Sequence, residues 1–236
     1  MFMKLLKMIM SSLVRSSHHQ KPSPPKESKP LEDFLSPENI RSLFNSKGYV
    51  FFDGNKNYNL NLVGVRRDNA GTNKFDDYLL VIYRDNSGEE LCKKYPITTD
   101  PGKYWLMNPM NPKGTAVLVP GQYRGTWQLG KHQNSYEALV QRKPVKVWRD
   151  NNKDEVIDYK HLKLINEGYF GINIHRSNPY DKSYVIGKWS AGCQVFQAIA
   201  DYKEFMVLCK RSSALYGNSF SYTLITEQDL REHINN

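Results

Sequence analysis

The sequence is poor in cysteine and lacks several common motifs. Its three cysteines lie at irregular spacing, so they form no disulfide framework and at least one thiol is free. Cysteine and histidine residues do not recur at the spacing of a structural zinc site. Neither a glycine-rich phosphate loop nor an internal repeat is present, which argues against nucleotide-binding and solenoid folds.

Acidic residues are in the minority. The chain has 33 Lys and Arg against 24 Asp and Glu, which gives a formal net charge of +9 and a pI near 9.3. Such a charge favours anionic partners, including nucleic acid, anionic lipid and acidic wall polymers, but does not choose among them. Because the basic residues form no compact run and no nucleic-acid motif accompanies them, we predict no nucleic-acid partner. We also predict no cofactor.

The first 30 residues do not have the composition of a folded core. Lys7 interrupts the apolar stretch, and no clear small-residue cleavage site follows, so the match to a secretory signal is poor. Residues 1–15 instead alternate apolar and basic positions at helical spacing, which predicts a helix on an anionic membrane surface, with a frayed terminus as the alternative. Residues 21–30, KPSPPKESKP, predict an extended spacer. We therefore assign residues 1–30 to a leader and linker and 31–236 to a single folded domain.

The remainder predicts many short strands and few helices. Ser36, Pro37 and Glu38 have the pattern of a helix start and Gly48 can end it, which predicts a short helix over residues 36–48. Further predicted elements are strands at 59–65, 77–83, 91–98, 115–119, 125–129, 137–141, 145–148, 170–174 and 221–226, and a helix at 198–216. Short strands separated by turn signals favour a mainly β fold, an antiparallel sandwich or barrel with a few peripheral helices.

The segment with most chemical content is GYFGINIHRSNPYDKSYVIGKWSAGCQVF, residues 168–196. A predicted strand ends near His175, and Cys193 follows 18 residues later. A free cysteine titrates at about 8.5, so it becomes a good nucleophile near neutral pH only when a neighbour such as an imidazole stabilises its thiolate. The alternative is that both residues are merely packed and hydrogen-bonded, the usual fate of such residues and our interpretation of Cys92 and Cys209.

The neighbours of this pair suit acyl chemistry. Gly192 allows a tight turn just before Cys193, so that nearby backbone amides can face a developing oxyanion. Ser190 can brace that turn. Asn173 lies two residues before His175 on the same strand face and can orient the imidazole, and a backbone carbonyl can do so equally well.

This segment resembles the catalytic domain of L,D-transpeptidases, in which a histidine after a strand precedes a Ser-His-Gly-Cys turn that carries the nucleophile. The resemblance extends more loosely back to residue 58, through TTDPGKYWL and GTAVLVPGQY. It implies that the domain is catalytic, with Cys193 as nucleophile, His175 as general base, and Ser190 and Gly192 in the oxyanion turn.

Three positions depart from the family pattern. Ala191 stands where the family has its second histidine, and Gln194 and Val195 replace the Ile-Arg that follows the cysteine. These changes affect the polar contacts around the acyl group and the recognition of a substrate carboxylate. The Ser-Ala-Gly-Cys-Gln-Val turn looks like that of sequences from bacteriophages and Bacteroides-type bacteria, which implies a wall-lytic role.

The resemblance implies a cysteine-dependent acyl transferase or peptidase acting on peptidoglycan stem peptides. An amine acceptor gives cross-linking or exchange, and water gives cleavage, as in an endolysin. The expected location is the cell envelope, or the host cytoplasm before lysis for a phage-encoded protein. The alternative is a non-catalytic cell-wall-binding or virion structural module that retains the fold.

A histidine and a set of oxygen-bearing side chains are further candidates for a functional site. His132 lies in a polar stretch and can line a substrate groove, but a solvated loop histidine is commoner, so it is left out of the catalytic set. Oxygen-bearing side chains follow the strand 145–148 at calcium-loop spacing: Asp150, Asn152, Asp154 and Asp158. Glu155 and His161 replace the loop glycine and the final glutamate, so a polar hairpin between VKVW and VIDY is favoured and no metal site is predicted.

Overall fold

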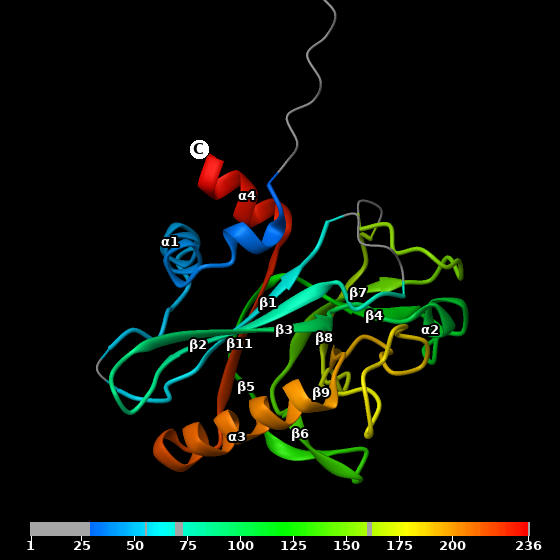
Figure 1. Cartoon of the computed structure of the whole chain (residues 1–236). Coiled ribbons are helices and arrows are strands. Elements are labelled where there is room, and N and C mark those ends of the chain that lie inside the picture. Colours follow the sequence, from blue (N-terminus) through cyan, green and yellow to red (C-terminus); the bar gives the residue numbers. More distant parts are fainter. Residues whose placement is uncertain (1–28, 55, 69–72, 160–161, 236) are drawn as a thin grey trace, which may run out of the picture. The chain divides into compact units, whose positions relative to one another are not determined.

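The strands form one closed sheet and one small open sheet (Figure 1). The computed structural model describes residues 29–54, 56–68, 73–159 and 162–235. The chain divides after Pro30, and the unit Leu31–Asn236 carries all the helices and strands that are described. The membrane-surface helix and most of the spacer predicted for the leader lie outside the described residues. In the part that is described, no helix is long and apolar enough to cross a membrane.

Among the described residues, eight strands close the barrel in the order β1 (Asn61–Arg66), β11 (Phe220–Thr226), β5 (Gly121–His132), β6 (Tyr136–Gln141), β9 (Ile174–Arg176), β10 (Gln194–Phe196), β3 (Glu90–Thr98) and β2 (Asp77–Arg84). The small sheet has the order β4 (Thr115–Leu118), β7 (Val145–Asp150) and β8 (Ile165–Gly168). The helices are η1 (Leu31–Phe34), α1 (Pro37–Lys47), α2 (Lys103–Met107), α3 (Ile199–Tyr216) and α4 (Glu227–Asn235).

The prediction of a strand-rich, mostly antiparallel sheet is confirmed in that coarse form. The fold is mixed α/β, and its closed sheet contains two parallel pairings, β1 with β11 and β9 with β10. Parallel neighbours need a long connection between them, and the connection from β9 to β10 is the loop that leads to Cys193. The second parallel pair is therefore the feature that matters for the site.

β2 is buried on both faces because it separates two apolar clusters. Leu79 and Val81 face the barrel core, whereas Leu80 and Ile82 face a second cluster formed with α1, α4 and η1. Successive side chains of a strand point to opposite faces, so a continuous apolar run such as DYLLVIY supplies both clusters. α1 and α4 cover the outer face here, while α3 packs against the barrel core on the other side of the sheet (Figure 1).

The two helices predicted within residues 31–236 are confirmed, and the first begins and ends at the predicted caps. The Ser36 side chain accepts a hydrogen bond of 3.2 Å from the Asn39 amide at the start of α1, and Gly48 ends this helix with a φ of 67°. α3 corresponds to the helix predicted over 198–216 and buries Phe205, Leu208 and Cys209. The local signals were sufficient because caps and apolar spacing act within one element.

Several local predictions are wrong. The strand predicted at 170–174 begins only at Ile174, and the short elements β8, β10, α2 and α4 were not predicted. The hairpin between VKVW and VIDY does not form, because residues 156–159 are not a strand and β7 pairs instead with β4 and β8. β8 has the sequence INEG and is largely exposed, so it has no alternation of apolar and polar residues that would predict a strand. It is a strand because it pairs with β7.

Candidate active site

His175 lies on β9, and Cys193 immediately precedes β10, the strand that pairs with β9 in parallel. β9 and β10 pair in a register that places Ile174 opposite Gln194 and His175 opposite Val195. Ile174 lies in the barrel core, and Gln194 accepts a hydrogen bond there from a core tyrosine, so these two face inward. Because side chains alternate, His175 and Val195 face outward, and Cys193, two residues before Val195, clusters with it on that face. Cys193 and His175 are thus diagonal neighbours on one face of the sheet.

The turn before Cys193 requires glycine and is braced by serine. Gly192 has a φ of 120°, and a Cβ atom there would come within 2.2 Å of the Ala116 carbonyl oxygen. The buried Ser190 hydroxyl accepts from the Gly192 amide at 3.2 Å and donates to the Cys193 carbonyl at 2.8 Å. The Gly192 amide is therefore engaged. The Cys193 amide makes no hydrogen bond with the described residues, so it is the donor that can meet an oxyanion.

A buried polar network fixes the loop on which this turn rests. The Gly102 amide donates to the Ser190 carbonyl at 2.9 Å. Just before it, Thr99 accepts from the buried Arg66 guanidinium at 2.9 Å through its hydroxyl and at 3.0 Å through its carbonyl, while its amide donates to Asp77 at 2.7 Å. Since buried charges persist only when paired and hydrogen-bonded, this network makes the loop a rigid support for the turn.

The thiol is neutral and engaged in the resting structure. Cys193 is 9% exposed, its Sγ donates to the Gly171 carbonyl at 3.2 Å, and Sγ accepts from the Asn173 amide at 3.4 Å. Burial raises the pKa of the thiol to about 11, which the Asn173 amide opposes. Sγ makes no hydrogen bond with His175 here, so a productive contact requires the cysteine side chain to rotate away from Gly171.

The imidazole of His175 has one nitrogen anchored and one free. Its Nδ1 donates to the Arg176 carbonyl at 2.7 Å, and the Tyr136 hydroxyl lies 3.0 Å from the same nitrogen. This leaves Nε2 as the basic nitrogen, and it makes no hydrogen bond with any described residue. Burial, followed by the neighbouring His132, lowers the pKa of His175 to about 3. Both members of the pair are therefore neutral near pH 7.

His132 belongs to this site, contrary to the prediction of a solvated loop. It lies at the end of β5, is 9% exposed and stacks on His175 with ring centroids 3.9 Å apart. The Asn173 side-chain amide donates to Nδ1 of His132 at 2.9 Å, so Asn173 orients this ring, and a backbone carbonyl orients His175. β5 extends three residues beyond the end predicted for this strand. Its pairing with the neighbouring strands brings His132 to the site.

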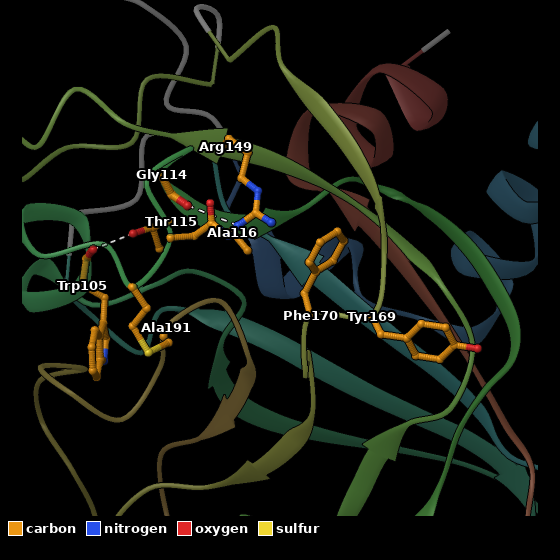
Figure 2. A pocket seen from close by; sticks show the side chains of 10 residues that line it. Trp105, Gly114, Thr115, Ala116, Arg149, Tyr169, Phe170 and Ala191 are labelled. Atoms are coloured by element: carbon orange, nitrogen blue, oxygen red, sulfur yellow. Dashed lines mark hydrogen bonds between the residues drawn. The ribbon is translucent and has the colours of Figure 1, made fainter.

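Cavities border the turn on both sides. One of about 350 Å³ is lined by His132, Tyr136, His175 and the segment 185–189. The other, of about 280 Å³, is lined by Ala191 and by side chains of α2, β7 and the loop after β8 (Figure 2). Trp189 lines the first cavity and Ala191 the second, so the two cavities meet the chain four and two residues before Cys193, which itself lines neither of them.

The calcium-like loop does not assemble into a metal-binding group. Within the described ranges, no three or more His, Cys, Asp or Glu side chains are placed to hold a metal ion. Asn152 and Asp154 hydrogen-bond to each other at 2.8 Å. Burial, with a contribution from Asp154, raises the pKa of Asp150 to about 6, and its Oδ1 is buried without a hydrogen-bond partner among the described residues.

Comparisons with family models, with curated proteins and with solved structures found no match. The motif of residues 168–196 and the geometry around Cys193 and His175 are therefore the features that point to a function.

Proposed function

We propose that this protein is a cysteine-dependent acyl transferase or peptidase with an L,D-transpeptidase-like fold, acting on peptidoglycan stem peptides. The observation that carries the proposal is the placement of Cys193 and His175 on one face of two parallel strands. The free Nε2 of His175 and the adjoining cavities supply the remaining requirements, a proton acceptor and room for an extended substrate.

The reaction proceeds through an acyl-enzyme. As a peptide carbonyl approaches, the Cys193 thiol turns from Gly171 and transfers its proton to Nε2 of His175 while sulfur bonds to the carbonyl carbon. The Cys193 amide stabilises the oxyanion. His175 then protonates the departing amine as the C–N bond breaks. An amine or water next attacks the thioester, gives its proton to His175 and releases the thiol.

Proton transfer accompanies attack in this scheme because the resting pair is neutral. A raised thiol pKa and a lowered imidazole pKa both disfavour a preformed ion pair. Negative charge develops only as the Cys193 sulfur bonds to the substrate carbonyl. The bound substrate also displaces water from Cys193 and His175. We therefore expect slow reaction with simple thiol reagents and faster acylation by ligands that fill the cavities.

A peptide of the cell wall fits the surroundings of the site. The loop between β9 and β10 presents three exposed aromatic side chains, Tyr180, Tyr184 and Trp189, which are available to contact a ligand. The net charge of +9 favours anionic partners, of which an acidic wall polymer is one. Transfer to an amine forms or exchanges cross-links in the envelope, whereas transfer to water cleaves the wall, as in phage lysis.

A specific observation also favours a second candidate, a non-catalytic wall-binding or virion structural module. The Cys193 thiol is held by Gly171 and Asn173 and makes no hydrogen bond with His175. A thiol that stays in this conformer is structural. Ligand binding in the same cavities is then the function, and no acyl-enzyme forms.

Labelling with a carbapenem, followed by mass analysis of the intact protein, separates the two candidates. We expect one covalent adduct on the parent and on Cys92→Ala, a control that removes a half-buried thiol elsewhere, and none on Cys193→Ala. His175→Ala is expected to fold and to slow acylation by a factor of about a hundred or more. A folded parent that forms no adduct, or equal labelling of Cys193→Ala, supports the non-catalytic module. Mass analysis of wall fragments then identifies the bond.

A further inference from the structure

Arg149 is a buried cation without an acidic partner. It lies on β7, is 9% exposed, and donates from Nε to the Asn166 side-chain oxygen at 3.0 Å and from Nη1 to the Gly114 carbonyl at 3.2 Å. Both acceptors are neutral, and no carboxylate among the described residues pairs with it. Burying an unpaired charge is costly, so the arrangement is best satisfied when an anion from outside completes it.

Arg149 lines the cavity beside Ala191, and one nitrogen of its guanidinium is not used by the described chain. Nη2 of Arg149 makes no hydrogen bond with the described chain, and it is not among the polar atoms sealed from solvent without a partner. The Phe170 ring lies 4.7 Å from the guanidinium carbon and supports its plane (Figure 2). A guanidinium held on three sides presents its remaining N–H groups in a fixed direction.

The walls of this cavity select a small, singly charged group with an apolar neighbour. Trp105, Met110 and Phe170 supply apolar surface, and Arg149 is the only charged side chain among the lining residues. A phosphate or polyanion is better matched by several cations, whereas a single guanidinium suits a carboxylate. The volume of about 280 Å³ accommodates a group the size of an amino acid.

The cavity adjoins the reacting residue. Ala191 lines it, and Gly192 packs so closely on Ala116, another lining residue, that no side chain fits between them. A ligand held here is therefore next to the turn that carries Cys193. We infer that this cavity is a carboxylate-binding subsite in which Arg149 holds a carboxylate group of the acyl-donor peptide. The assignment to an acyl donor rests on the proposed function, but carboxylate binding needs no turnover.

The test measures binding to the full-length Cys193→Ala protein, which cannot form an acyl-enzyme. The probes are N-acetyl-D-alanine and its carboxamide, which differ in charge but hardly in size. The indole N–H signal of Trp105, which lines the cavity, reports binding in NMR titrations. A hydrogen bond to a charged group contributes about 1.5–3 kcal/mol, so we expect the acid to bind at least about tenfold more tightly than the amide.

Two further variants locate the selectivity. Arg149→Gln is expected to abolish the preference for the acid, whereas Lys146→Gln, which removes the same charge from an exposed position of β7, keeps it. If the Cys193→Ala protein with Arg149 intact binds the acid and the amide equally well, the inference is overturned. This result does not depend on whether Arg149→Gln folds. A folded Arg149→Gln protein that still prefers the acid overturns it as well.

The outcomes also separate this inference from the proposed function. Acid-selective binding in Cys193→Ala, combined with no carbapenem adduct on the parent, leaves the subsite standing and removes the catalytic role. Adduct formation on the parent without acid-selective binding supports the catalytic role and overturns the subsite.

Discussion

The imidazole of His132 is stacked on that of His175, with ring centroids 3.9 Å apart and 19° between the ring planes. Two rings this close resist carrying a proton each, because like charges at short range destabilise each other. His132 therefore helps to keep His175 neutral, which a general base requires, while burial contributes most of the effect.

Replacing His132 with phenylalanine keeps the stacked surface and removes the titrating neighbour. We expect the pKa of His175 to rise from about 3 but to stay below its ordinary 6.5, because burial persists. An NMR titration of the His175 ring proton measures it. His233→Phe, which changes a half-buried histidine of α4, is the control and leaves the His175 pKa unchanged. An unaltered His175 pKa in folded His132→Phe contradicts the role assigned to the stack.

Acid is expected to destabilise the fold through His175. Its folded pKa lies below its unfolded value, so between about pH 6.5 and pH 3 the unfolded chain binds the extra proton, and stability falls as the pH falls. One such group contributes up to about 1.4 kcal/mol per pH unit to the free energy of unfolding. Urea unfolding at several pH values is expected to show a shallower acid loss in His175→Gln than in the parent or in His233→Gln. Parallel pH curves would mean that His175 titrates normally.

The sequence predicted best what is decided within one element. Ser36 caps the start of α1 and Gly48 its end, and both are recognisable because capping is local. β2 is recognisable from its continuous apolar run. The outward face shared by Cys193 and His175 depends instead on the register of β9 and β10, two strands of three residues each. His132 and Arg149 come from β5 and β7, and no spacing in the sequence links them to the Cys193 turn. Such contacts are set by tertiary pairing, which overrides local pattern.

Gly192→Ala is expected to destabilise the protein and to abolish labelling of Cys193. The substitution combines left-handed strain with a Cβ that would lie 2.2 Å from the Ala116 carbonyl oxygen, so backbone must move, and we expect a loss of about 2 kcal/mol or more. Gly171→Ala is the matched control, because its φ is 69° but nothing lies within 4 Å of the added atom, and strain alone costs about 1–2 kcal/mol. Chemical denaturation compares the two, and a Gly192→Ala protein no less stable than Gly171→Ala would show that the turn can relax.

Ala191→His tests whether position 191 faces the thiol. The alanine lines a cavity of about 280 Å³, which leaves room for an imidazole without displacing Trp189 or the inward-facing Gln194. A polar ring beside the thiolate opposes the burial that raises the Cys193 pKa to about 11, so the apparent pKa of alkylation should fall and the rate at neutral pH should rise.

Iodoacetamide reactivity measured against pH decides this last prediction, with Ala191→Leu as the control that fills the same space without a donor. The leucine variant should react no faster than the parent, since added apolar bulk further shields the thiol. Because the new ring also occupies the cavity that Arg149 borders, Ala191→His should weaken binding of N-acetyl-D-alanine as alkylation becomes faster. Coincident alkylation profiles for the parent and Ala191→His, with both proteins folded, would mean that the side chain at 191 points away from Sγ, and the comparison of this turn with the Ser-His-Gly-Cys motif would then fail at that position.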